Sequence, residues 1–399
     1  MTHQNDAPKG FDTLAIHGKR EKKQASNALN APIFMTSTFT FDNTDHVANV
    51  MSFKSDDYVY TRGNNPTLRE FENRMADLEG GVGAVAFASG MAAISSVLLS
   101  LLEPGDLIVA HRTLYGSAHS FIEKFLTKYK INFAFEDLTD LSVLEKYAGR
   151  DDLKVIYFET PSNPTLDIID IKSVVAFSDK NEVKTVVDNT FASPYFQQPL
   201  SDGIDVVVHS ATKYISGHGD VIAGVAISKD MNYVQSLKFE YMCELGGALS
   251  PFNAWLLLRG LKTLGVRMRQ HEANAIQVAN FLENHAKVTK VYYPGLSSFK
   301  GHELAKSQMK GFGAVIAFEI DGDLEAAKRV VNGVDMAKLA VSLGDCETLI
   351  EMPAAMTHLG YDKEALASFG LSEEMIRLSI GLEDAADIIE DLRQSLDQL

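Results

Sequence analysis

Cysteine, tryptophan and basic residues are all scarce in this sequence. Its 399 residues include two cysteines, one tryptophan and 37 lysines and arginines, against 53 aspartates and glutamates. The two cysteines, Cys243 and Cys346, are far apart and provide neither a disulfide framework nor a CxxC metal site. The net charge of −16 repels phosphate backbones and anionic membrane surfaces. We therefore expect no metal site and no nucleic-acid or membrane partner.

Long hydrophobic runs are also missing. No apolar run approaches the roughly 18 residues that a membrane-spanning helix needs. The polar start of the chain lacks the basic-then-apolar pattern of a secretory signal. Because 46% of the residues are hydrophobic and 23% are charged, the composition is that of an ordinary globular protein. We predict a cytoplasmic protein that is long enough for two domains.

Short β-branched runs alternate with helical patterns from about residue 82 onward. The runs of strand length lie at 84–88, 107–110, 155–158, 185–187 and 206–208. Helix-like segments, such as 91–102 and 117–129, separate them. This alternation is typical of an α/β domain, in which a mostly parallel sheet carries helices on both faces.

The pattern changes after residue 250. A helix-rich stretch, further strands at 314–319, 339–342 and 376–380, and a final amphipathic helix predict a smaller α+β domain. Residues 1–60 show little periodicity and read as an arm that packs on a neighbouring subunit. We therefore predict an arm at 1–60, a large cofactor-binding domain at 61–255 and a C-terminal domain at 256–399.

Two motif matches fail their context tests. A Gly-x-Gly-x-x-Ala match at 81–86 precedes a predicted strand instead of following one, which excludes a dinucleotide fingerprint. The His-Glu pairs at 271–272 and 302–303 lack the second histidine of a zinc-protease motif. No phosphate-binding P-loop is present.

Polar residues gather where three consecutive predicted strands end. The strand at 155–158 runs into residues 159–164, the strand at 185–187 into Asp188, and the strand at 206–208 into residues 209–220. In open α/β sheets, ligands bind outside the carboxyl ends of the strands. These segments therefore predict one shared site.

The residue types at these strand ends favour pyridoxal 5′-phosphate. Lys213 stands where it can form a Schiff base, with Ser210 and Thr212 beside it as phosphate ligands. Asp188 can pair with a protonated pyridine nitrogen, and the strand-to-helix turn at 89–91 offers free amides to an anion. Taken singly, each residue also has an ordinary structural explanation as a solvated lysine, a turn residue or a helix cap. Their joint placement favours the cofactor.

A set of short motifs strengthens this interpretation. They lie at 60–67, 89–93, 114–116, 159–164, 187–191, 210–214, 216–220, 342–349, 356–358 and 377–381. With these motifs the chain resembles, over nearly its whole length, the pyridoxal-phosphate enzymes of cysteine and methionine metabolism, the cystathionine γ-lyase-like family. The resemblance implies a PLP-dependent transferase fold of type I, similar to aspartate aminotransferase. It also implies a homotetramer, built as a dimer of dimers with shared active sites.

The resemblance further implies roles for individual residues. Lys213 would bind the cofactor covalently and move protons, Asp188 would hold the pyridine nitrogen protonated, and Tyr115 would stack on the ring and protonate the leaving thiol. Phosphate contacts would come from the residues Ser89, Gly90, Met91, Ser210 and Thr212. The neighbouring subunit would add Tyr60 and Arg62 to this phosphate site. Arg377 would bind the substrate carboxylate, with Ser342 and Asn163 nearby.

Two positions favour methionine as the substrate, and with it a methionine γ-lyase releasing methanethiol, 2-oxobutyrate and ammonia. Cystathionine γ-lyases commonly carry glutamates where this chain has Val59 and Val341. Glutamate suits the distal ammonium of cystathionine, whereas valine suits the methyl thioether of methionine. Two departures from the methionine lyases are Ser117, where they usually have cysteine, and Met352, where they commonly have histidine.

Other activities stay open at this point. A cystathionine γ-lyase with cysteine desulfhydrase activity would use the same cofactor. So would an O-acetyl- or O-succinylhomoserine sulfhydrylase, which the segment 242–251 resembles as much as it does the lyases. A catalytically silent PLP-binding protein is the alternative that is not an enzyme.

Overall fold

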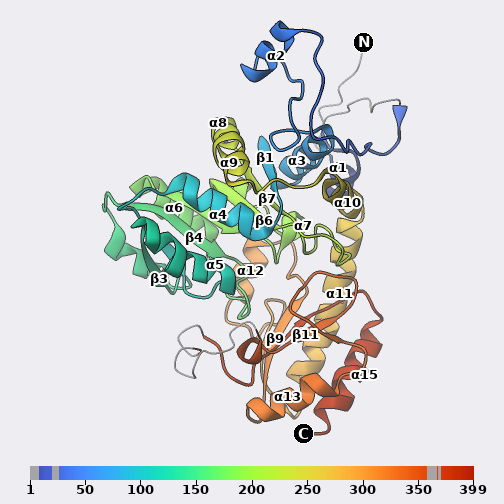
Figure 1. Cartoon of the computed structure of the whole chain (residues 1–399). Coiled ribbons are helices and arrows are strands. Elements are labelled where there is room, and N and C mark those ends of the chain that lie inside the picture. Colours follow the sequence, from blue (N-terminus) through green and yellow to red (C-terminus); the bar gives the residue numbers. More distant parts are fainter. Residues whose placement is uncertain (1–8, 20–26, 357–365, 367–369) are drawn as a thin grey trace.

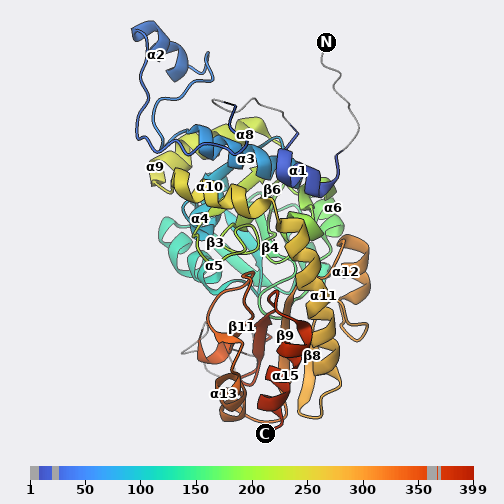
Figure 2. The ribbon, with the colours of Figure 1, turned by 90° about the vertical axis from the view of Figure 1, so that its right-hand side faces the viewer.

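The computed structural model describes residues 9–19, 27–356, 366 and 370–399. These residues form two β-sheets, each covered by helices, with the long helix α11 (Leu264–Glu283) running from the larger unit along the smaller one (Figures 1 and 2). Among the described helices, none combines the length and the hydropathy of a membrane-spanning segment.

The larger sheet has seven strands in the order β1-β7-β6-β5-β4-β2-β3. Neighbours from β6 to β3 are parallel, and only β7 runs antiparallel to β1 and β6. The strands are β1 (Gly83–Phe87), β2 (Leu107–His111), β3 (Asn132–Glu136), β4 (Leu153–Glu159), β5 (Lys184–Asp188), β6 (Val206–Ser210) and β7 (Gly224–Ser228). The prediction of a mostly parallel α/β sheet is therefore confirmed.

Both faces of this sheet are buried, which is why its strands read as continuous apolar runs. In β4, Ile156 and Phe158 pack into one hydrophobic core, whereas Val155 and Tyr157 pack into the core on the other face. Helices α3 (Pro66–Glu79), α6 (Ile171–Asn181) and α10 (Pro251–Leu261) contribute to the first core. Helices α4 (Gly90–Leu101), α5 (Gly116–Ser120) and α8 (Met231–Ser236) contribute to the second.

The smaller sheet has five strands in the order β10-β11-β12-β9-β8 and is mainly antiparallel. Its strands are β8 (Val288–Tyr292), β9 (Val315–Ile320), β10 (Lys338–Leu339), β11 (Leu349–Glu351) and β12 (Ile376–Ser379). Helix α11 packs on it with α13 (Leu324–Gly333) and α15 (Ala385–Leu396), through a separate core that includes Ile388 and Leu392. The predicted α+β unit at the C-terminal end is therefore present. The residue limits proposed for the domains stay a prediction.

The remaining helices are short. They are α1 (Phe11–His17), α2 (Thr44–Met51), α7 (Ser193–Phe196), α9 (Cys243–Leu245) and α12 (His302–Gln308). Helix α2 projects away from the body, at the top of both views (Figures 1 and 2). Between residues 27 and 64 only Val50 is buried, which agrees with an arm that has its packing partner elsewhere.

Several element predictions need correction. Strands β3, β7, β8 and β11 were not predicted, since they are short or lack a clean alternation. The predicted helix at 117–129 is α-helical only to Ser120 and continues as a π-helix (Phe121–Phe125) and a 3-10 helix (Leu126–Tyr129). The strand expected at 339–342 is limited to Lys338–Leu339.

Candidate active site

One cavity of about 670 Å³ lies where the carboxyl ends of β4, β5 and β6 face the smaller sheet. Most of the predicted site residues line it, namely Ser89, Gly90, Met91, Tyr115, Asn163, Asp188, Ser210, Thr212, Lys213, Val341, Ser342 and Arg377. The expected shared site is therefore a single hollow to which both sheets contribute.

Helix α4 starts at the edge of this cavity. Ser89 caps the helix, because its side chain accepts a hydrogen bond from the Ala92 amide at 3.0 Å. A Cβ on Gly90 would lie 2.9 Å from the Cβ of Ser210, so only glycine lets the helix start lie this close to the end of β6. The free amides at the start of α4 and the Ser210 hydroxyl thus adjoin one another, as an anion site requires.

Lys213 lies just beyond β6 and reaches across to the smaller unit. Its Nζ donates to Ser342 Oγ at 2.9 Å. Burial, together with the positive charge of Arg377, lowers the pKa of the Lys213 ammonium below its usual value. The residue is therefore biased towards the neutral amine, the form that attacks a carbonyl group.

Asp188 ends β5 and is 8% exposed. Its Oδ1 accepts hydrogen bonds from the backbone amide and the hydroxyl of Thr190, at 2.9 and 2.5 Å. Burial raises the pKa of the Asp188 carboxyl, and the two Thr190 hydrogen bonds act against that rise. Because both bonds use one oxygen, the carboxylate is fixed while it lines the cavity.

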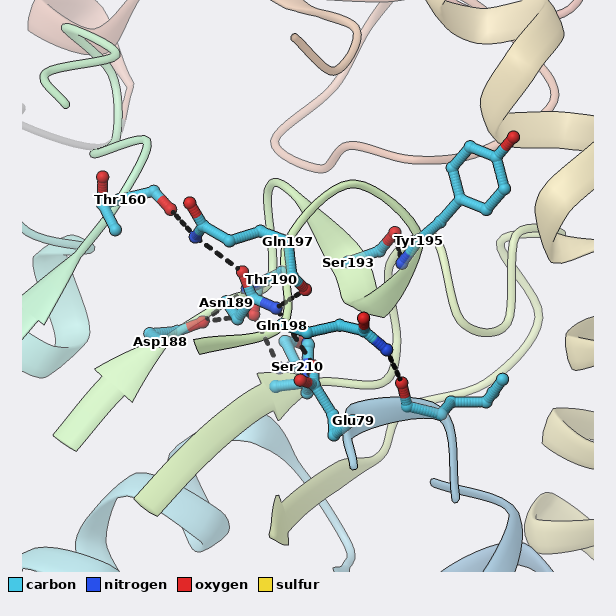
Figure 3. Close-up of polar contacts among 12 residues, drawn as sticks. Glu79, Thr160, Asp188, Asn189, Thr190, Ser193, Tyr195, Gln197, Gln198 and Ser210 are labelled. Carbon is cyan, nitrogen blue, oxygen red and sulfur yellow. Dashed lines mark hydrogen bonds and ion pairs between the residues drawn. The ribbon is translucent and has the colours of Figure 1, made fainter. Parts of the chain in front are cut away.

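A polar network lies behind Asp188, below the floor of the cavity (Figure 3). Glu79, the last residue of α3, is fully buried, and its Oε1 accepts from His209 Nε2 at 2.6 Å and from Asn189 Nδ2 at 3.0 Å. Asn189 also donates to the Gln197 carbonyl, and Gln197 Nε2 donates to the Thr160 carbonyl at 2.8 Å. The network ties α3 to the segments that follow β4 and β5 and to the end of β6.

Arg377 on β12 faces the same cavity and is 4% exposed. Its Nη1 donates to Asn163 Oδ1 and its Nη2 to the Ser342 carbonyl, both at 2.8 Å. Nη1 also forms an ion pair with Glu351 Oε1 at 2.9 Å. The guanidinium is therefore oriented by groups from both units, as the clamp for a carboxylate must be.

Tyr115 stands on the rim, with 44% of its surface exposed. Its backbone amide donates to Glu159 Oε1 at 2.7 Å, which holds the tyrosine against the end of β4. Val341 also lines the cavity and is 58% exposed. Both side chains therefore lie where the site is open to solvent or to another subunit.

Three predicted site residues lie elsewhere in this chain. Val59, Tyr60 and Arg62 line a different hollow of about 550 Å³, together with Cys243. The Cys243 thiol contacts the Arg62 carbonyl at 3.7 Å, and the Arg62 guanidinium lies 5.7 Å from the centre of the Tyr60 ring. This placement agrees with the prediction that these residues serve a neighbouring subunit, which stays a prediction.

Sequence reasoning missed several residues that line the cavity. The most notable are Glu159, Thr190 and Glu351. The first two belong to polar segments after β4 and β5, so their position at a strand end was the available signal. Glu351 gave none, because it ends a strand of three residues that was not predicted. His358, part of one quoted motif, lies outside the described residues.

The donor set of the cavity fits pyridoxal 5′-phosphate. A lysine with a lowered pKa, a fixed aspartate and an anion site at a helix start are the three groups that this molecule requires. Within the described ranges, by contrast, no cluster of three histidine, cysteine or acidic side chains is placed to bind a metal ion.

Comparison with known proteins shows what the chain is similar to. The family model described as Cys/Met metabolism PLP-dependent enzyme matches residues 12–397. An L-methionine gamma-lyase of Porphyromonas gingivalis is 46% identical over 392 residues, 98% of each chain. A cystathionine beta-lyase of Lactococcus lactis subsp. cremoris is 42% identical over 97% of this chain and 98% of its own. A Campylobacter jejuni crystal structure that holds N′-pyridoxyl-lysine-5′-monophosphate superposes with a TM-score of 0.93 at 34% identity, covering 98% of this chain and 100% of that one.

Proposed function

Because the chain belongs to the family of Cys/Met metabolism PLP-dependent enzymes, we propose that it is a carbon–sulfur lyase acting on L-methionine. The reaction converts methionine and water into methanethiol, 2-oxobutyrate and ammonia. The observation that carries the proposal is the single cavity, in which Lys213, Asp188 and Arg377 face an apolar wall that includes Val341, Leu343 and Met356. That wall suits a methyl thioether.

The cofactor is held by residues from the larger unit. Lys213 would bind its aldehyde carbon, Asp188 would pair with its ring nitrogen, and the start of α4 with Ser210 and Thr212 would bind its phosphate. Tyr60 and Arg62 of the partner subunit would complete the phosphate site. When bound, pyridoxal 5′-phosphate supplies an electron sink that stabilises negative charge at the substrate carbon next to the amine.

The protein side chains bind the substrate and move its protons. Arg377, oriented by Asn163 and Ser342, binds the α-carboxylate and so fixes the amino acid in the cavity. Lys213 removes the proton from Cα, for which the lowered pKa of its amine is suited. Tyr115 donates a proton to the departing sulfur. Asp188 stays ionised through its hydrogen bonds from Thr190.

A tetramer and a cytoplasmic location complete the proposal. An arm with one buried residue between positions 27 and 64 and Tyr60 at 49% exposure leave a surface that a second subunit can cover. A dimer of such dimers would share its active sites in pairs.

A second activity is supported by one comparison. The Lactococcus relative is a cystathionine beta-lyase at nearly the same identity as the methionine lyases. Against this activity stands Val341, which gives the distal ammonium of cystathionine no carboxylate at that position. The O-acetyl- and O-succinylhomoserine sulfhydrylases and the cystathionine γ-lyases use the same cofactor groups and differ only in what this wall recognises.

The decisive experiment compares substrates. The holoenzyme is incubated with L-methionine, with L-cystathionine, and with O-acetylhomoserine plus sulfide, and both thiol and 2-oxobutyrate are measured. Methanethiol and 2-oxobutyrate in equal amounts from methionine support the proposal. Silence with methionine but turnover of another substrate keeps the cofactor site and removes the specificity assignment. No turnover, with a cofactor band that borohydride bleaches, identifies a silent binding protein.

A further inference from the structure

Glu351 is a buried acid in contact with the arginine that we assign to the substrate carboxylate. It ends β11 and lies directly opposite Arg377 of β12 in the antiparallel register. Glu351 Oε1 is 2.9 Å from Arg377 Nη1, and the two residues are 2% and 4% exposed. Among the described residues, neither carboxylate oxygen of Glu351 accepts a hydrogen bond of normal geometry. The acid is thus held by charge alone.

The charges around Glu351 come from two elements. Arg377 faces it from β12, and Lys213 faces it from the segment after β6. Glu159 and Asp188 line the same cavity from the ends of β4 and β5, and Asp345 interacts with Lys213 from the loop before β11. Burial raises the pKa of the Glu351 carboxyl, and the positive charges of Arg377 and Lys213 only partly oppose that rise.

A bound substrate adds a second carboxylate to this guanidinium. Arg377 Nη1 already contacts Glu351 and Asn163, and Nη2 contacts Ser342, whereas Nε has no hydrogen-bond partner among the described residues. Two ionised carboxylates beside one buried cation repel each other, and one of them then takes up a proton. The substrate carboxylate is the stronger acid and Glu351 is the buried one, so the proton goes to Glu351.

We propose that binding of a substrate carboxylate at Arg377 is coupled to uptake of one proton by Glu351. The proton comes from solvent, no bond between heavy atoms changes, and the net charge of the site is the same before and after binding. Once protonated, the Glu351 carboxyl can donate a hydrogen bond to the substrate, which an ionised carboxylate cannot do. The inference rests on the proposed role of Arg377 and makes Glu351 a positioning residue.

The coupling predicts weaker substrate binding as pH rises, because more Glu351 must then be protonated at each binding event. Glu351→Gln removes this cost, since glutamine keeps the shape and can donate from its amide at any pH. We expect the variant to bind a carboxylate about tenfold more tightly than the parent at pH 8, which corresponds to about one unit of altered pKa.

The test uses a ligand that cannot react. 4-(Methylsulfanyl)butanoate is methionine without its amine, so it offers only the carboxylate and the thioether. Its binding to the holoenzyme is measured by titration calorimetry in two buffers of different ionisation enthalpy, which gives the number of protons taken up. We expect uptake approaching one proton per site in the parent and none in Glu351→Gln.

Glu159→Gln is the matched control, because Glu159 is a buried acid of the same cavity for which no contact with Arg377 is present. Proton uptake should persist in this variant. A parent enzyme that binds the ligand without taking up a proton overturns the proposal, and so does uptake that persists in Glu351→Gln.

A kinetic measurement covers the case of weak ligand binding. The KM for methionine should rise with pH more steeply in the parent than in Glu351→Gln, with kcat changing less than KM. Equal pH profiles of KM overturn the coupling. Failure of the proposed function looks different, since methionine is then not turned over at all, while the calorimetry still reports on Glu351.

Discussion

Two buried acids stand on opposite sides of the cavity, and their surroundings differ. Behind Asp188, Glu79 Oε1 accepts hydrogen bonds from both His209 and Asn189, and the network continues through Gln197. Across the cavity, Glu351 has only the ion pair with Arg377. The first wall is fixed by directional bonds and suits a permanent cofactor, whereas the second depends on charge and can respond to each substrate.

Lys213 joins the two walls, because it follows β6 and donates to Ser342. Lys213→Ala should abolish methionine turnover, a loss of about a thousandfold or more, since it removes both the cofactor attachment and a proton-transfer group. The visible absorption band of the cofactor should vanish as well. Turnover assays and absorption spectra check this, with circular dichroism as the control for folding. A variant that keeps both band and turnover would sink the cofactor assignment.

Removing the acid of the fixed wall should damage stability most. Glu79→Ala leaves the donors of His209 and Asn189 without an acceptor in the interior, for an expected loss of about 3–5 kcal/mol in the free energy of unfolding. Urea unfolding measures this loss. Glu79→Gln keeps an acceptor oxygen and should lose clearly less. Equal losses in the two variants would mean that the carboxylate charge, and not the directional bonds, fixes this wall.

The two units meet at His271, which gives stability a pH dependence. His271 Nδ1 donates to the Ile380 carbonyl at 2.7 Å, and Nε2 has no hydrogen-bond partner among the described residues. Burial lowers the pKa of His271 from 6.5 to about 4. Because the unfolded chain binds the proton more readily, stability is intact above pH 6.5 and falls as the pH drops towards 4.

The expected loss follows from the two pKa values. A difference of 6.5 − 4 units at 1.36 kcal/mol per unit gives about 3 kcal/mol between pH 7.5 and pH 4. Urea unfolding across this range measures the loss, and His271→Asn should reduce it. Identical pH profiles in parent and variant would assign the acid sensitivity to other groups.

The sequence predicted the fixed wall better than the responsive one. Asp188, Ser210 and Lys213 were identified because they follow apolar runs that end at one edge of a parallel sheet. Glu351 was missed because β11 has three residues, too few for a period to appear. Arg377 was found only through the family resemblance. Its contacts with Asn163 and Glu351 depend on how the two units pack, which no local pattern encodes.

The smallest expected effect tests what the responsive wall recognises. Val341→Glu adds a carboxylate to the cavity at a position that is 58% exposed, so folding should tolerate the change. The new charge disfavours the methyl thioether of methionine and favours the distal ammonium of cystathionine. We expect kcat/KM for methionine to fall about tenfold and that for cystathionine to rise, a difference on the scale of one altered pocket contact.

Val341→Gln separates charge from size in this experiment. It should lower methionine turnover in part, without the gain on cystathionine, because it offers no negative charge to the ammonium. The ratio of the two kcat/KM values is therefore the informative quantity. An unchanged ratio in Val341→Glu would mean that position 341 does not contact the distal part of the substrate. Recognition would then depend on another residue of the wall, with Leu343 and Met356 the next positions to exchange.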